Sequence, residues 1–216
     1  MNETSALEKY KKVLSFNGMQ SPVLDYGKGE PVLCIHGFPD NHKVWRKQVK
    51  PLAEAGYRVI APDMRGFGEA SKPLGVENYV FPIIMQDVLA LLDQLGLDKV
   101  HLLGHDYGAA LSWRLAFNYP SRFHSFTSLS VGAPRNPGWT IIPQREKNWY
   151  YCLFRTVGTA EKQLSHNNFQ LMRDWMREHE DVEDIIAHFS QVGHLTAALN
   201  WYRAFSGPID PKSIAP

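Results

Sequence analysis

Cysteine, net charge and long apolar runs are scarce or absent in this sequence of 216 residues. Cys34 and Cys152 are the only cysteines, which excludes a disulfide framework and favours reduced thiols and a cytoplasmic location. Lys and Arg number 23 against 22 Asp and Glu, so a net charge of +1 provides no long-range attraction to nucleic acid or anionic lipid. No apolar run approaches the length of a membrane span, and the polar residues 1–12 lack the apolar stretch of a secretory signal. We therefore expect a small molecule as the partner, and neither nucleic acid nor a membrane.

Short apolar runs alternate with segments of helical periodicity in the first part of the chain. A hairpin is predicted over residues 13–26, turning at Asn17-Gly18. The runs that predict strands buried on both faces are 31–35, 57–61, 99–104 and 123–131. The segments that predict helices are 44–55, 77–95 and 107–118. This alternation predicts an α/β fold with a mostly parallel, doubly wound sheet and helices on both of its faces.

The composition changes after Pro134. The following segment is rich in Trp, Tyr, His and Arg, has apolar residues at helical spacing and contains no convincing buried strand. We interpret residues 1–136 as the N-terminal portion of the α/β core. Residues 137–206 are interpreted as an inserted helical lid, and 207–216 as the start of the return to the core.

Residues 104–108 read Gly-His-Asp-Tyr-Gly and lie between a predicted buried strand and a predicted helix. A sharp strand-to-helix turn brings the backbone close to its neighbours, so a side chain at either glycine would clash. Asp106 is then held above the carboxyl edge of the sheet, where α/β sheets bind ligands. A glycine-flanked aspartate alone would more often be an Asx turn or a helix N-cap. Together with the His-Gly-Phe-Pro segment at 36–39 and the strand order, it predicts a nucleophile.

An aspartate at this position predicts attack on saturated carbon. A carboxylate is already ionised at neutral pH, whereas a serine hydroxyl needs a base before it can attack a carbonyl. Strained epoxides and carbon–halogen bonds are the natural electrophiles, and the product is an ester on Asp106. Hydrolysis of that ester requires an activated water and donors for the oxyanion. The backbone N–H groups of Phe38 and Tyr107 are the candidate oxyanion-hole donors.

Three segments, 36–39, 63–68 and 104–108, occur in this order and each follows a predicted strand. Together they resemble the epoxide hydrolase branch of the α/β-hydrolase superfamily, and the resemblance covers the whole chain. It implies the α/β-hydrolase fold and two lid tyrosines that hydrogen-bond the epoxide oxygen and act as the acid. Tyr202 and Tyr150 lie in the segments similar to those that hold these tyrosines. Helical spacing alone would leave both as packing residues of the lid.

Other aromatic residues and histidines near these segments have weaker assignments. Trp201, Tyr151 and His36 are expected to line the substrate pocket. We also interpret His36 and His105 as structural, holding loops beside the site by hydrogen bonds, and neither as a base. Neither a metal nor a cofactor is expected, because no histidine pair falls at ligand spacing with carboxylates within one helix. Residues 66–68 are too short for a dinucleotide fingerprint.

In the family that the chain resembles, the lid is followed by further strands that carry an acid and then the catalytic histidine. The chain ends at Pro216, before either could occur. We therefore expect the C-terminal strands, the base and its acid to be missing, and the alkylated Asp106 to turn over very slowly or not at all. An unpaired strand edge is expected to self-associate or to pair with a missing C-terminal segment.

Two alternative functions remain open. Haloalkane dehalogenases resemble this core, but they usually hold halide with an Asn after His-Gly and a Trp after the nucleophile. This chain has Phe38 and Tyr107 at those positions. A non-catalytic protein could instead use the lid cleft to bind a small molecule or a partner. Asp106 favours the enzyme, because a protein that only binds needs no nucleophile at this strand-to-helix turn, the elbow.

Overall fold

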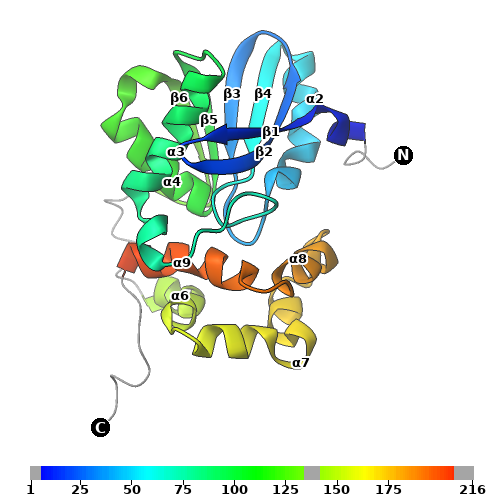
Figure 1. Cartoon of the computed structure of the whole chain (residues 1–216), viewed down its shortest axis with the longest axis vertical. Coiled ribbons are helices and arrows are strands. Elements are labelled where there is room, and N and C mark those ends of the chain that lie inside the picture. The colour runs from blue at the N-terminus through cyan, green and yellow to red at the C-terminus, as the bar shows by residue number, and fades with distance from the viewer. Residues whose placement is uncertain (1–5, 134–141, 207–216) are drawn as a thin grey trace. The chain divides into compact units, whose positions relative to one another are not determined.

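The computed structural model describes residues 6–133 and 142–206, which belong to two compact units. The sheet unit comprises Met1–Ser71 and Phe81–Pro134, and the helical unit comprises Lys72–Val80 and Arg135–Pro216 (Figure 1). Residues 72–80 lie within the range predicted for the core, but they group with the helical unit. The reason is that the short helix η3 (Val76–Tyr79) packs against α9 (His194–Ser206). Within the described ranges, no helix combines the length and the hydropathy that crossing a membrane requires.

The sheet unit is built on six strands in the order β1-β2-β4-β3-β5-β6. Their bounds are β1 Lys11–Phe16, β2 Met19–Gly27, β3 Glu30–Ile35, β4 Tyr57–Pro62, β5 Val100–His105 and β6 Phe123–Leu129. The pairs β1–β2 and β2–β4 are antiparallel, and β4–β3, β3–β5 and β5–β6 are parallel, so the predicted mostly parallel sheet is confirmed. The predicted hairpin is also confirmed: Asn17 and Gly18 have φ of 47° and 71°, the positive values that a tight hairpin turn needs.

Between residues 8 and 133 the α-helices of the sheet unit are α2 (Arg46–Glu54), α3 (Phe81–Gln94) and α4 (Tyr107–Asn118). Short 3₁₀ helices occur at Glu8–Tyr10 (η1), His42–Trp45 (η2) and Pro120–Arg122 (η4). The single helix expected over residues 77–95 is wrong at its start. Val80 is extended, with ψ of 145°, and separates η3 from α3. Pro82 lies in the first turn of α3, where a missing N–H breaks no helical hydrogen bond.

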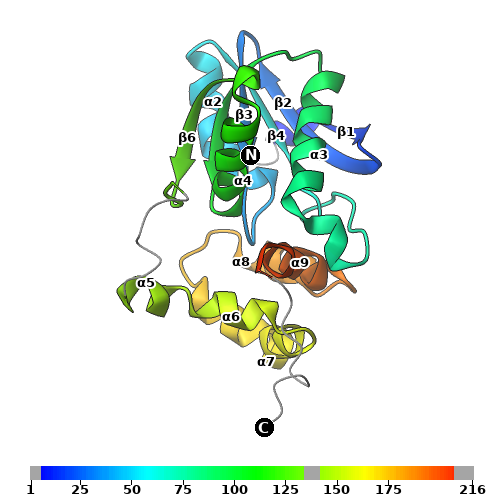
Figure 2. The ribbon, with the colours of Figure 1, turned by 90° about the vertical axis from the view of Figure 1, so that its left-hand side faces the viewer.

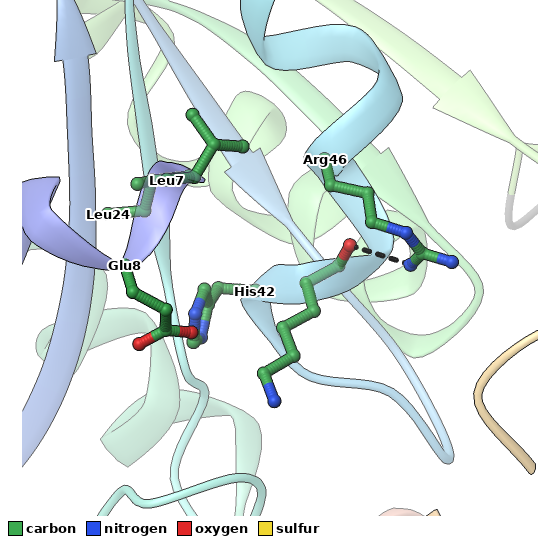
Figure 3. Close-up of a pocket in the computed structure, with 6 residues that line it drawn as sticks. Leu7, Glu8, Leu24, His42 and Arg46 are labelled. Atoms are coloured by element: carbon green, nitrogen blue, oxygen red, sulfur yellow. Dashed lines mark hydrogen bonds between the residues drawn. The ribbon is translucent and has the colours of Figure 1, made fainter. Parts of the chain in front are cut away.

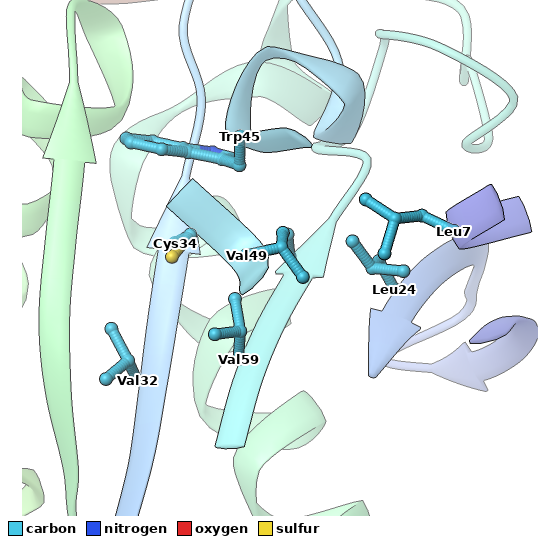
Figure 4. Packing of buried hydrophobic residues seen from close by; sticks show 8 residues of the cluster. Leu7, Leu24, Val32, Cys34, Trp45, Val49 and Val59 are labelled. Atoms are coloured by element: carbon cyan, nitrogen blue, oxygen red, sulfur yellow. The ribbon is translucent and has the colours of Figure 1, made fainter. Parts of the chain in front are cut away.

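Strands β3 and β4 are buried on both faces, as the continuous apolar runs predicted. The same prediction is wrong for β6, an outer strand in which only Phe123 is buried. Val32 and Cys34 of β3 belong to a cluster with Val59 of β4 and with Trp45 and Val49 of η2 and α2 (Figure 4). Successive side chains of a strand point to opposite faces. The intervening Leu33 and Ile35 are nevertheless fully buried. Burial raises the pKa of the Cys34 thiol to about 12, so this cysteine acts as a packing residue.

The helical unit contains α5 to α9, and its described residues include no strand longer than a single bridge. The bounds not yet given are α5 Ile142–Lys147, α6 Trp149–Arg155, α7 Thr159–Trp175 and α8 Val182–Phe189 (Figure 2). Helix α6 packs against both α7 and α9. Helix α7 is interrupted where Asn167, Asn168 and Phe169 take positive φ.

Candidate active site

Asp106 is the single residue between the end of β5 and the start of α4. Its φ of 53° and ψ of −125° lie in a region that residues with a side chain rarely adopt, at a cost of about 1–3 kcal/mol. Its C=O accepts from Ala110 N–H at 3.0 Å, and its N–H donates to Leu129 C=O at 3.3 Å. These bonds to α4 and β6 hold the strained turn.

Three glycines allow the backbone to approach this turn. A Cβ on Gly104 would lie 2.6 Å from Ser112 Oγ, and one on Gly108 would lie 2.2 Å from the carbonyl oxygen of Ile35. A Cβ on Gly37, in the facing loop, would lie 2.4 Å from Asp106 Oδ1. Each distance is shorter than a real Cβ contact. The prediction that a side chain at Gly104 or Gly108 would clash is confirmed.

Two backbone N–H groups hold the Asp106 carboxylate. Phe38 N–H donates to Oδ1 at 3.0 Å. Tyr107 N–H also donates to the carboxylate. The two groups identified from the sequence as oxyanion donors are thus hydrogen-bonded to one resting carboxylate. An oxyanion formed at this carbon would meet the same pair of donors.

The environment of Asp106 opposes its ionisation. Burial raises the pKa of the carboxyl above its ordinary value, and the negative charge of Asp40 acts in the same direction. The N–H groups of Tyr107 and Phe38 favour the carboxylate, but they offset only part of the effect of burial. The carboxylate is therefore poorly solvated and is held by directed backbone donors.

His36 connects the loop that carries Phe38 to the loop after β4. Its Nε2 accepts from Met64 N–H at 2.9 Å, so Nδ1 carries the proton and donates to Gly37 C=O at 3.0 Å. Burial lowers the pKa of the ring, which keeps it neutral. Because both nitrogens bind backbone, His36 positions Gly37 and Phe38 and presents no nitrogen to a substrate. His105 differs from the loop-holding role expected for it, since its buried Nδ1 has no hydrogen-bond partner among the described residues.

Asp63 is a buried carboxylate that accepts hydrogen bonds from two segments, and the sequence patterns did not mark it as a residue of the site. Its Oδ1 accepts from both the backbone N–H and Nδ1 of His42, at 2.9 and 2.6 Å, and its Oδ2 accepts from Glu69 N–H at 2.9 Å. Burial would raise the pKa of Asp63, but the bonds from His42 and the nearby His36 outweigh it and lower the pKa to about 2. His42 also lines a small pocket beside Glu8 and Leu24 (Figure 3). The signal in the sequence was the position of Asp63 directly after a strand.

The helical unit brings the predicted tyrosines together. Tyr202 of α9 lies edge-to-face with Tyr150 and Tyr151 of α6, with ring centroids 6.1 and 5.4 Å away. The ring of Phe154 also packs on Tyr202, with the ring centroids 4.9 Å apart. Trp201 is buried on the same helix as Tyr202. The predicted acid tyrosines and two of the expected pocket residues thus come from two packed helices.

An ion pair fixes α9 within the helical unit. Arg203 donates from Nη1 and Nη2 to the two carboxylate oxygens of Glu161 at 2.8 and 2.9 Å, and its side chain is 1% exposed. Thr196 Oγ1 donates to the same carboxylate at 3.0 Å. These bonds hold the Glu161 pKa below its ordinary value despite burial. The pair spans 42 residues of sequence, so no local pattern could have indicated it.

Comparisons with known proteins show which family and fold the chain shares. Residues 30–209 match the family model described as the alpha/beta hydrolase fold. Epoxide hydrolase 3 of Siraitia grosvenorii is 34% identical, over 89% of this chain and 71% of its own length. Epoxide hydrolase A of Mycobacterium tuberculosis is 29% identical, over 90% of this chain and 74% of its own. The crystal structure of an epoxide hydrolase from Vigna radiata has a TM-score of 0.76 and 31% identity, covering 89% of this chain and 70% of that one.

Proposed function

Because the chain belongs to the epoxide hydrolase branch of the α/β-hydrolase superfamily, we propose that it opens small-molecule epoxides with Asp106 as the nucleophile. The observation that carries the proposal is a carboxylate at the strand-to-helix elbow, where Phe38 N–H holds its Oδ1 at 3.0 Å. A carboxylate is a competent nucleophile toward a strained ring carbon without prior deprotonation. A protein that only bound its ligand would gain nothing from a strained, desolvated carboxylate.

The first step is alkylation. With Oδ1 held by backbone donors, Oδ2 attacks a ring carbon, a new C–O bond forms and the ring C–O bond breaks. The departing oxygen takes a proton from the phenol of Tyr202 or Tyr150, leaving a hydroxyalkyl ester on Asp106 and a phenolate that water reprotonates. A phenol with a pKa near 10 can protonate a strongly basic alkoxide while remaining neutral beforehand. We assign Trp201 and Tyr151 to the wall of the substrate pocket.

The second step is hydrolysis of the ester. Water attacks the carbonyl carbon of the Asp106 ester and gives a proton to solvent, and the carbonyl oxygen becomes a tetrahedral oxyanion that the N–H groups of Phe38 and Tyr107 stabilise. We assign no residue of this chain as the base, so this step is expected to be very slow or not to occur. One donor of this kind contributes about 10²–10³-fold in rate. Collapse of the intermediate breaks the bond to the alkyl oxygen, which takes the proton of the added hydroxyl, so that a diol is released and the carboxylate is restored. The same two donors therefore serve the resting enzyme and the hydrolytic step.

The test separates ring opening from mere binding. The full chain is incubated with styrene oxide, and intact-mass spectrometry and diol analysis follow the reaction. We expect either one adduct per chain, mapped to Asp106, or diol, and neither from Asp106→Asn. A 1-bromoalkane should leave Asp106 unmodified. Binding of the epoxide without adduct or diol would refute the proposal, and so would equal reaction of Asp106→Asn.

The acid is tested separately. Tyr202→Phe is expected to slow ring opening by about 10²-fold, the usual contribution of a general acid. Tyr150→Phe should slow it less than the double variant does. Tyr151→Phe is the matched control. It removes a hydroxyl from the same aromatic cluster but keeps the ring, and we assign no proton transfer to that hydroxyl. Equal rates in Tyr202→Phe and Tyr151→Phe would remove Tyr202 from the mechanism.

A further inference from the structure

Three ionisable side chains meet at the beginning of three neighbouring strands. Glu30 is the first residue of β3, and His101 and His124 are the second residues of β5 and β6. The three strands are parallel neighbours, so these residues share the edge of the sheet at which strands begin. Asp106 follows the far end of β5. The cluster is therefore separate from the candidate active site.

The Nε2 atoms of both imidazoles face the same carboxylate oxygen. His101 Nε2 lies 3.3 Å and His124 Nε2 lies 3.6 Å from the same oxygen, Glu30 Oε1. The two ring centroids are 5.3 Å apart. Imidazoles bound to one tetrahedral cation through bonds of about 2.0–2.1 Å hold their ring centres about 5.2 Å apart. The pair is thus spaced as two ligands of a single metal ion.

The second nitrogen of His101 is already occupied, as in many metal-binding histidines. His101 Nδ1 lies 2.7 Å from Ser125 Oγ, a contact that directs the lone pair to Nε2 when Nδ1 donates. The ring also lies edge-to-face on Tyr57 at 5.8 Å, which limits its rotation. The side chains of His101 and His124 are 27% and 37% exposed, so an ion can reach them from solvent.

We propose that His101 and His124 bind a divalent transition-metal ion of the Zn²⁺, Ni²⁺ or Cu²⁺ class. Neutral imidazole is a preferred ligand of these ions. No group of three or more His, Cys, Asp and Glu side chains within residues 6–133 and 142–206 could hold a metal ion. The site accordingly has two protein ligands, with water in its other positions. Glu30 Oε1 lies between the two Nε2 atoms, so this half-exposed carboxylate turns aside to admit the ion and offsets its charge.

Metal binding at this site would connect β5 to β6, an outer strand of the sheet. An ion that binds the folded chain and not the unfolded chain raises stability with its concentration. The full chain, without an affinity tag and after EDTA treatment, is therefore unfolded by heat at pH 7.5 with NiCl₂, ZnCl₂ or MgCl₂. We expect a saturable rise of the midpoint with Ni²⁺ or Zn²⁺ and none with Mg²⁺, which prefers oxygen ligands. Equilibrium dialysis should give one Ni²⁺ per chain.

Variants locate the site. His101→Gln and His124→Gln should each weaken Ni²⁺ binding at least about tenfold, and Glu30→Gln should weaken it less. His166→Gln, which removes an exposed imidazole on α7, is the matched control and should bind as the parent does. His194→Gln tests the other close histidine pair, His188 and His194, whose rings are 4.4 Å apart.

Each outcome has a defined meaning. Stoichiometric binding that is lost with His101 or His124 and kept in the two control variants supports the proposal. Absence of saturable binding, or equal binding in His101→Gln and the parent, overturns it, and so does loss of binding only in His194→Gln. Alkylation of Asp106 should be unchanged in all these variants, so failure of the metal proposal leaves the proposed function standing. The metal-free midpoint of each variant verifies that it is folded.

Discussion

Gly37→Ala tests whether the loop before Phe38 must touch the nucleophile. The added Cβ would lie 2.4 Å from Asp106 Oδ1, 2.6 Å from Asp106 Cβ and 2.7 Å from the Tyr107 nitrogen. Ordinary contacts begin at 3.4 Å, so the loop and the elbow must separate by about 0.7–1.0 Å. The elbow cannot retreat easily, because Gly108 packs directly on the backbone of β3. The Phe38 loop must therefore move.

That movement breaks the hydrogen bond from Phe38 N–H to Asp106 Oδ1, which is 3.0 Å long in the structure. Phe38 N–H orients the carboxylate for attack, and a misplacement of about 1 Å at a reacting group costs about 10²-fold in rate. Overpacking costs about 1–3 kcal/mol of unfolding free energy. We expect Gly37→Ala to remain folded with a lower midpoint, and to lose at least about 10²-fold in the rate of ring opening. Single-turnover reaction with styrene oxide and urea denaturation measure the two effects.

Gly18→Ala is the control. Gly18 has φ of 71° and no atom within 4 Å of an added Cβ, so this substitution costs about 1 kcal/mol through backbone strain alone. It should lower stability and leave ring opening unchanged. A Gly37→Ala variant that opens the epoxide at the parent rate would refute the reasoning, since the donor geometry would then be irrelevant to Asp106.

Three further outcomes are expected. Because burial raises the pKa of Asp106, ring opening should fall with acid at a midpoint above about 3.9; single-turnover rates between pH 3 and 8 check this, and a lower midpoint contradicts it. Asp63 has a depressed pKa of about 2, so its contribution of about 2–3 kcal/mol is present above pH 5 and is lost as pH falls toward 2. In urea denaturation, Asp63→Asn should lose that amount at neutral pH and show a weaker acid dependence; an unchanged pH profile argues against the role of His42. Glu161→Gln leaves the buried Arg203 without its carboxylate and should cost about 3 kcal/mol by the same assay, whereas a loss below about 1 kcal/mol would show that the pair is dispensable.

Local patterns in the sequence were enough to predict most of the sheet and the strand-to-helix turn at Asp106. Apolar runs such as 31–35 indicate strands buried on both faces because strand side chains alternate between faces every residue. The Asn17-Gly18 turn and the Gly-His-Asp-Tyr-Gly segment at 104–108 were equally readable, because each meets a steric requirement within a few residues. The helix predicted over 77–95 is wrong at Val80. Hydrophobic periodicity does not show that a proline, here Pro82, is best placed in the first turn of a helix, so it could not locate the start of α3.

Features that depend on distant partners were decided only by the tertiary structure. The neutral tautomer of His36 follows from Met64 N–H, 28 residues away, and the Arg203 pair follows from Glu161, 42 residues away. The raised pKa of Asp106 follows from burial, which is a property of all surrounding elements together. The sequence determined by itself which residues could perform chemistry, since residue type and turn geometry are local. Solvation, protonation and partners belong to the folded chain, because they depend on distances that only packing sets.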